Sequence, residues 1–310
     1  MTDIVRPFWI MVQKEISDHV RSWKFIILVA LILLTTIGSL FTVLSIIRGN
    51  AANINSDNTF LFLNLFTTSD GSLPPFITLI GFLGPLLGIA LGFDVINSER
   101  NRGTLSRVIS QPIPRDHFIN SKFVGALAVI CVLVFSLGFL VMGLGIISIG
   151  IPPTPDEFLR IIIFLLLSCV YIAFWLNLGI VFSTTFRQSS TSALSCLAIW
   201  LFFTAFYSML VQILANAVYR DPYSIKVLTL ILSRLSPNYL YSELTTILLT
   251  PSIRSLGALS IEQIYGAIPS SLPLGQSLLL IWPHITGLIA ASIICFGISY
   301  IFFMRQEIRA

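Results

Sequence analysis

The chain has 310 residues, of which 55% are hydrophobic and only 10% are charged, and its mean hydropathy is +0.91. Soluble domains carry about 25% charged residues, so this composition excludes a soluble protein of this size. Several apolar runs reach the roughly 20 residues that a helix needs to cross a bilayer. The formal net charge of +4 gives no reason to expect nucleic acid as a partner. Composition therefore predicts an all-α, polytopic membrane protein.

The N-terminal segment predicts a helix that lies in the membrane interface. Apolar residues recur there at spacings of three and four, with charged residues between them: Trp9, Val12, Ile16, Val20 and Trp23. This pattern is typical of an amphipathic helix with its tryptophans at headgroup depth. The alternative is a helix packed on a soluble domain, but no soluble domain follows. The charges also argue against a signal peptide. We expect residues 1–24 to form an interfacial elbow helix and residues 25–310 to form the transmembrane domain.

Six apolar runs predict six membrane-spanning helices. They cover residues 25–47, 75–93, 123–149, 159–184, 192–214 and 278–303. The stretch 48–70 is predicted to be a polar connection. The segment 215–276 is too polar to span, and we expect it to form short helices on or near the membrane surface.

Four glycines recur in the second span, at positions 81, 84, 88 and 92. Small residues spaced by about four allow helices to approach closely in lipid. The spacing is equally compatible with a kink at Pro85. If the chain pairs with a second subunit, these glycines and the apolar faces of the first and fifth spans are the expected contact.

The distribution of Lys and Arg predicts the orientation. With the N-terminus inside, the inner segments hold 12 basic residues and the outer segments hold 6. The positive-inside rule therefore places both termini in the cytoplasm and the segment 215–276 outside. We expect a multi-pass protein of the cell membrane.

The usual catalytic motifs are missing from the sequence. It contains no Gly-Lys pair and so no phosphate-binding Walker A loop, no H-E-x-x-H and no G-x-S-x-G. The four cysteines lie in apolar runs and form no C-x-x-C pair. We therefore predict no catalytic residue, no metal site and no cofactor on this chain.

Three polar side chains fall within or at the ends of the predicted spans: Asn177, Gln212 and His284. Each is a candidate for lining a substrate path. The alternative is a helix-to-helix hydrogen bond, because an unpaired polar group in lipid is costly.

The densest charge cluster lies between the second and third spans, in residues 94–122. It contains Asp94, the pair Glu99-Arg100, Gly103-Thr104-Leu105, the stretch Ser110-Gln111-Pro112-Ile113-Pro114-Arg115, and finally Lys122. This order resembles the signature of the permease subunits of ABC exporters of the second type. Leu235-Ser236-Pro237, followed by Tyr239 and Tyr241, also resembles the outer segment of that family.

The resemblance implies a transmembrane permease subunit that acts with other chains. Two ABC ATPase subunits would bind ATP and Mg and dock on the cytoplasmic face, and a second permease subunit, identical or related, would complete the complex in membrane lipid. The resemblance makes residues 94–122 the coupling loop. Its expected coupling residues are Asp94, Glu99, Arg100, Gly103, Thr104, Leu105, Val108, Ile109, Pro112 and Arg115.

The physical reading of this loop agrees with a docking role. A short helix from Thr104 to Ser110 would present Leu105, Val108 and Ile109 on one face, and Pro112 would end it. An apolar face with charged flanks fits a groove on a partner. The alternative is a solvated loop that merely obeys the positive-inside rule.

Three functions remain open at this level. The first is an ATP-driven export permease. The second, suggested by relatives with a sizeable outer segment, is an ABC-type membrane subunit that transmits force to an extracytoplasmic partner in metalloenzyme maturation without moving a substrate. The third is an intramembrane enzyme or assembly factor that acts without ATP.

The predicted orientation can be tested by labelling. A cysteine placed at Ser270, in a background without the four native cysteines, should react with an impermeant maleimide in intact cells. Labelling only after permeabilisation would reverse the assignment.

Overall fold

The computed structural model describes residues 2–49, 60–69, 71–103, 114–251 and 272–305, and every regular element in these ranges is a helix. Six helical segments are long and apolar enough to cross a membrane, which confirms the predicted count. They are Trp23–Ile47, Phe76–Asn101, Arg115–Ile149, Pro155–Thr185, Ser189–Val218 and Leu274–Arg305.

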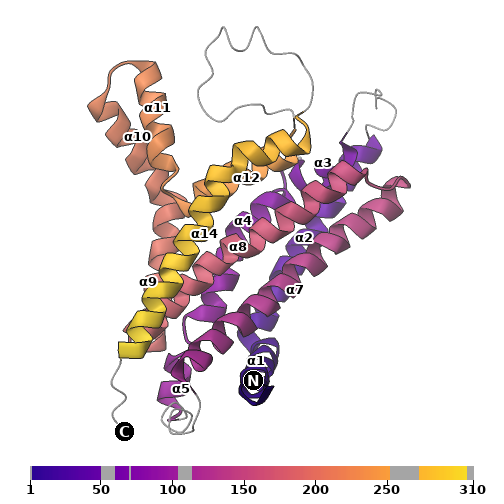
Figure 1. Cartoon of the computed structure of the whole chain (residues 1–310). Helices are drawn as coiled ribbons and strands as arrows, with labels where there is room; N and C mark the ends of the chain where they lie inside the picture. Colours follow the sequence, from indigo (N-terminus) through magenta and orange to yellow (C-terminus); the bar gives the residue numbers. More distant parts are fainter. Residues whose placement is uncertain (1, 50–59, 70, 104–113, 252–271, 306–310) are drawn as a thin grey trace.

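The helices form one elongated bundle (Figure 1). In chain order they are α1 (Thr2–Val20), α2 (Trp23–Gly49), α3 (Leu61–Thr67), α4 (Phe76–Gly92), α5 (Asn97–Asn101), α7 (Arg115–Ile149), α8 (Pro155–Thr185), α9 (Ser189–Leu201), the π-helix η2 (Phe202–Phe206), α10 (Tyr207–Val218), α11 (Pro222–Ser233), α12 (Pro237–Leu249) and α14 (Leu274–Arg305). Helices α1 and α5 and the last turn of α14 lie at one end of the bundle, here called the terminal end (Figure 1). Helices α3, α11 and α12 lie at the other end, here called the far end (Figure 1).

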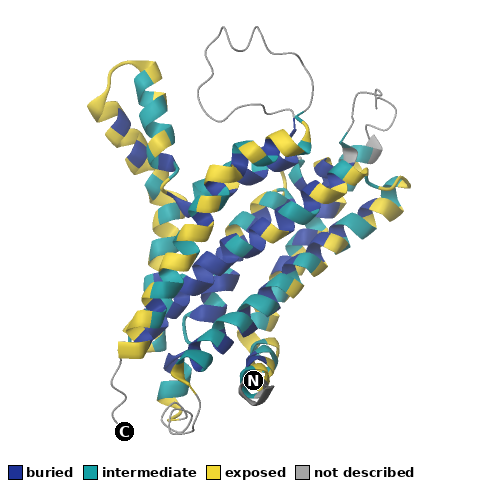
Figure 2. Ribbon diagram, viewed as in Figure 1, coloured by how far each residue is buried: buried dark blue, intermediate teal, exposed yellow. Residues whose placement is uncertain are grey.

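Helix α8 is the centre of the bundle. It packs against α4, α14, α7 and α12, and buried residues follow it along most of its length (Figure 2). Its start is fixed by a capping box, in which Thr154 accepts from the Glu157 backbone and the Glu157 side chain accepts from the Thr154 backbone. Pro155 at the first helical position adds to this start signal.

Helices α4 and α8 approach so closely that their backbones touch. A Cβ atom on Gly88 would lie 2.6 Å from the carbonyl oxygen of Ile172, and one on Gly92 would lie 2.5 Å from that of Leu176. On the α8 side, Gly179 faces the backbone of Gly92. The glycines therefore permit the expected close approach of two helices, but both helices, α4 and α8, belong to this chain. The expectation that these glycines contact a second subunit is wrong for Gly88 and Gly92, because α8 of the same chain covers them.

The N-terminal helix packs against α7 through one side and leaves other apolar residues exposed. Val12 is buried, whereas Trp9 and Val20 are exposed, as an interfacial helix requires. The helix ends at Val20, and Trp23 begins α2 instead of ending α1. Gly125 of α7 permits the close packing, because a Cβ there would lie 2.8 Å from the Cβ of Glu15.

One far-end segment differs from the sequence prediction, and a second contains the short helices that the sequence predicted. The stretch 48–70 was predicted to be a polar connection, but it contains the buried helix α3, whose Phe66 packs edge-on against Phe76 and Phe164. The segment 215–276 was predicted to lie on or near the membrane surface. Within it, α11 packs against α10, whereas α12 buries Tyr241 and Leu244 against the bundle. The apolar residues of α3 and α12 are too few to span a membrane but enough to cover the core.

The close contact between α4 and α8 yields a stability prediction. Gly92→Ala should lower the free energy of unfolding by about 1–3 kcal/mol, because the added methyl group collides with the α8 backbone. Gly143→Ala in α7 is the matched control, because nothing lies within 4 Å of its Cβ position. It should be neutral or stabilising by up to about 1 kcal/mol. Unfolding of both variants in mixed micelles measures the difference, and equal stability would contradict the contact.

Candidate coupling site

The coupling loop begins at the terminal end with a short helix that is fastened to α8. The backbone N–H groups of Ile96 and Asn97 donate to the Ser183 hydroxyl at 2.9 and 3.3 Å. The buried Asn97 amide, with its nitrogen turned toward α8, donates to the carbonyl oxygens of Phe186 at 2.7 Å and Ser183 at 3.0 Å. These bonds attach the start of α5 to the end of α8.

Gly103 ends α5 in the left-handed conformation, with a φ of 68°. A residue with a Cβ adopts this conformation only at a cost, which explains why glycine precedes the rest of the loop. The next predicted coupling residues lie outside the described residues: Thr104, Leu105, Val108, Ile109 and Pro112. The described part of the loop resumes before Arg115, an exposed residue that begins α7.

A network of ion pairs joins α1, α5 and α7, and we call its members Lys14, Glu15, Glu99 and Lys122 the terminal-end network. The buried Lys122 ammonium lies 2.9 Å from the Glu15 carboxylate and 3.5 Å from that of Glu99. Lys14 lies 3.3 Å from Glu99 and pairs more distantly with Glu15, at 3.8 Å. Each carboxylate therefore contacts both ammonium groups, and the charges of the network balance.

The packing of α1 on α7 creates this network. Lys122 and Gly125 lie three residues apart and share a face of α7. Because Gly125 has no side chain, α1 comes close enough for Glu15 to reach Lys122. Lys122 also lies over the Phe118 ring, 4.9 Å from its centroid.

A second ion pair fixes the other side of the loop. Asp94 contacts Lys24 at the start of α2, and the same ammonium lies 4.5 Å from the centre of the Phe93 ring. The described first half of the loop, residues 94–103, is thus attached to two preceding helices. Asp94 pairs with α2, and Glu99 pairs with α1.

Glu99 differs from the expectation for a wet cytoplasmic loop. Its side chain is only 13% exposed, and two ammonium groups neutralise it. Removing the Glu99 carboxylate would leave Lys122 with Glu15 as its remaining ion-pair partner. Its neighbour Arg100 is half-buried and lies within electrostatic reach of Arg187. With the exposed Arg102 and Arg115, these side chains give the loop a cationic rim.

Two groups of α1 have shifted pKa values. Burial alone would lower the pKa of Lys14, but the carboxylates of Glu99, Glu15 and Asp18 outweigh it and raise the pKa. Burial lowers the pKa of His19, and the Lys122 charge acts in the same direction. At neutral pH a charged Lys14 therefore lies on the same helix as a neutral His19 imidazole.

The three polar side chains proposed for a substrate path lie in different surroundings. Asn177 on α8 donates to the hydroxyl and carbonyl oxygens of Ser292 on α14, at 2.9 and 3.2 Å. His284 is buried on α14, with its Nε2 2.7 Å from the carboxylate of Glu243 on α12. Gln212 is exposed on α10. The structure does not bring the three together, and a path-lining role stays a prediction.

The far end holds two buried ionic groups that the sequence analysis missed. Arg160 is fully buried, pairs with Asp156 and donates to the carbonyl oxygen of Leu248 at the end of α12. Glu243 accepts from Arg234 as well as lying against His284. Burial would raise the pKa of Glu243, but the hydrogen bonds from His284 and Arg234 lower it overall.

Some of these residues carried a signal in the sequence. Glu15 follows Val12 by three positions and therefore lies on the apolar stripe of α1, where a charged residue needs a partner. Arg160 follows Asp156 by four positions at the start of an apolar run. Glu243 had no such signal, because its partners Arg234 and His284 come from other helices.

Neither a metal site nor a disulfide is present in the part of the chain that the structure describes. No group of three His, Cys, Asp or Glu side chains there could hold a metal ion, and the four cysteines are free.

The fold is therefore that of a multi-pass membrane subunit with a fastened loop at one end. A family model described as "ABC-2 family transporter protein" matches residues 9–308, and the chain belongs to this family. It is similar to the probable ABC transporter permease protein NosY of Pseudomonas aeruginosa, with 25% identity over 208 residues, which cover 65% of this chain and 68% of that protein. The protein of the same name from Stutzerimonas stutzeri is 27% identical over 209 residues, with coverage of 65% and 68%. The family to which the sequence was compared is thus confirmed, whereas the role of residues 94–122 stays a prediction.

The terminal-end network predicts different costs for two lysines. Lys122→Met should lower the free energy of unfolding by about 3–5 kcal/mol, because it leaves two largely buried carboxylates with only the more distant, half-exposed Lys14 of the network to neutralise them. Lys14→Met is the matched control, since the Lys14 side chain is 55% exposed, and it should cost at most about 1 kcal/mol. Unfolding in mixed micelles compares the two, and a larger loss for Lys14→Met would show that the buried pair is not the main contact.

Proposed function

We propose that this chain is the permease subunit of an ATP-driven ABC exporter, energised by separate ATPase subunits that dock on residues 94–122. The observation that carries the proposal is the attachment of this loop to three helices at once. Glu99 reaches α1 and α7 through Lys14 and Lys122, and Asn97 reaches the end of α8. A push on the loop is therefore transmitted to the bundle and is not absorbed by a free segment.

The proposal includes the orientation and the assembly. The terminal end faces the cytoplasm, in agreement with the 12 to 6 distribution of basic residues and with the cationic rim of the loop. Two ATPase subunits bind ATP and Mg, and a second permease subunit, identical or related, completes the complex. The exposed apolar faces of α2 and of the segment Ser189–Val218 provide the pairing surface, together with lipid.

A second candidate function uses the same coupling loop, and the names of the relatives do not favour it over the first. Both are probable ABC transporter permease proteins called NosY. In this alternative, the chain transmits force to an extracytoplasmic partner in metalloenzyme maturation and moves no substrate. Both functions need the same coupling loop, so they differ only in what the far end does. Vesicle transport assays with the whole complex separate them.

The docking function is tested by co-purification of the ATPase subunit encoded with this chain. Leu105→Asp should release the ATPase, because an unpaired charge in an apolar groove costs several kcal/mol. Asn101→Asp places the same charge on an exposed residue of the same loop and should retain the ATPase. Full ATPase binding and full turnover with Leu105→Asp would remove the loop from the docking contact.

Glu99→Gln in the same complex tests transmission. The amide keeps the shape of the carboxylate but loses its charge, so Lys122 and Lys14 lose one of their partners. We expect the ATPase to remain bound while ATP turnover of the lipid-embedded complex falls. Unchanged turnover would mean that the terminal-end network does not take part in coupling.

A further inference from the structure

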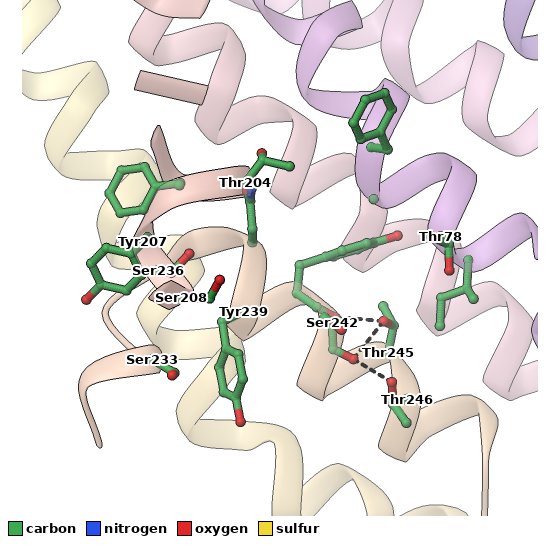
Figure 3. Close-up of a pocket in the computed structure, with 16 residues that line it drawn as sticks. Thr78, Thr204, Tyr207, Ser208, Ser233, Ser236, Tyr239, Ser242, Thr245 and Thr246 are labelled. Carbon is green, nitrogen blue, oxygen red and sulfur yellow. Dashed lines mark hydrogen bonds between the residues drawn. The ribbon is translucent and has the colours of Figure 1, made fainter. Parts of the chain in front are cut away.

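A cavity of about 350 Å³ lies near the far end, between α4, η2, α10, α11 and α12 (Figure 3). Its volume falls in the range of small-molecule sites, which run from about 300 to 1,000 Å³. A water molecule occupies about 30 Å³ of liquid, so the cavity is far larger than a single bridging water needs. The cavity is therefore large enough for an organic ligand.

Most of the residues that line the cavity carry hydroxyl groups and none is charged, although most of the lining surface itself is apolar. Hydroxyl groups reach it from every one of these elements, as Figure 3 shows for Thr78, Thr204, Ser208, Ser233 and Ser242. None of the sixteen described residues that line it is Lys, Arg, His, Asp or Glu. Glu243, although next to Ser242 in the chain, directs its carboxylate to His284 and Arg234.

One wall of the cavity is held rigid by contacts to α8. The Tyr241 ring stacks on Tyr171 at 4.1 Å between centroids, and its hydroxyl lies 2.8 Å from that of Ser168. The Tyr171 hydroxyl donates to Asn238, whose amide nitrogen donates to Thr204 at 2.9 Å. A ligand therefore meets polar groups that are already fixed in place, which lowers the cost of ordering them.

Ser236 differs from these bonded side chains. It lines the cavity and is only 1% exposed, yet its hydroxyl has no hydrogen-bond partner among the described residues. Although Ser236 is the N-cap residue of α12, its side chain makes no capping bond. A buried hydroxyl without a partner is costly, so a ligand group that bonds to it after a rotation of the Ser236 side chain toward the cavity would gain affinity.

We propose that this cavity binds an uncharged ligand with several hydroxyl groups and an apolar part, of the alkyl glycoside type. The hydroxyls of the lining match the polar head, and the half-exposed Phe82 provides an apolar surface at the same cavity. A charged head would be desolvated without a counter-charge, which excludes anions and cations of the same size. The inference deepens the proposed function, because such a ligand would be the cargo.

Binding can be measured on the chain alone, without ATPase or ATP, by native mass spectrometry in a neutral detergent. The probes are octyl β-D-glucoside, octyl phosphate and octyltrimethylammonium, which share one apolar chain and differ in the charge of the head. We expect the glucoside to bind at least about tenfold more tightly than either charged probe. Equal binding of the three probes would overturn the proposal.

Two variants test whether the glucoside binds in this cavity. Ser236→Ala should weaken glucoside binding about fivefold, the size of one hydrogen bond, without loss of fold stability, because the hydroxyl has no partner to lose. Ser208→Phe should abolish binding by filling the cavity from an exposed position on α10. Thr286→Val on α14 is the matched control, since its exposed hydroxyl bonds only to the Pro283 carbonyl oxygen of its own helix.

The outcomes separate this inference from the proposed function. Unchanged binding in both cavity variants would refute the site while leaving ATPase docking on residues 94–122 intact. If the wild-type chain binds the glucoside normally but does not bind an ATPase subunit, the proposed function is refuted, whereas the ligand site in the cavity stands.

Discussion

The backbone contact between α4 and α8 sets the geometry of both ends of the molecule. Gly88 and Gly92 bring α4 against Ile172 and Leu176, and Gly179 of α8 completes the contact at the terminal end. Because the two helices touch there, the turn after Gly92 delivers Ile96 and Asn97 to the hydroxyl of Ser183. A side chain at these glycines would separate the helices, and the first half of the coupling loop would lose its attachment to α8.

Charge balance explains why the elbow helix stays on the bundle. A buried lysine on a transmembrane helix is unfavourable unless anions neutralise it, and Lys122 has Glu15 from α1 and Glu99 from α5. The same two carboxylates hold Lys14 at the exposed edge. Moving α1 away from α7 would leave buried charges unpaired, so the ion pairs favour α1, α5 and α7 staying together.

The sequence predicted the membrane-spanning helices well because their signal is local. A run of about 20 apolar residues identifies a span without knowledge of its neighbours. Helix α3 was missed because a short apolar run such as Phe60–Phe66 has no local feature that separates a buried helix from a connection. The pairing of Glu243 with His284 was also beyond local patterns, since 41 residues separate them. The family motif identified Glu99 as a residue of interest. Its burial could not be predicted in this way, because it depends on Lys14 of α1 and Lys122 of α7, which are distant in sequence.

Helix α8 connects the two ends of the bundle physically. At the terminal end, its Ser183 holds α5. At the far end, its Ser168 and Tyr171 hold Tyr241 and Asn238 of α12, which line the cavity. The Tyr171 hydroxyl also donates to the Gly81 carbonyl oxygen of α4 at 3.1 Å, so both helices that meet the loop also meet the cavity. Because protein interiors are closely packed, a displacement of one end of α8 is expected to be carried along the helix. If the two proposals above hold, α8 is the element that would connect the loop to the cavity.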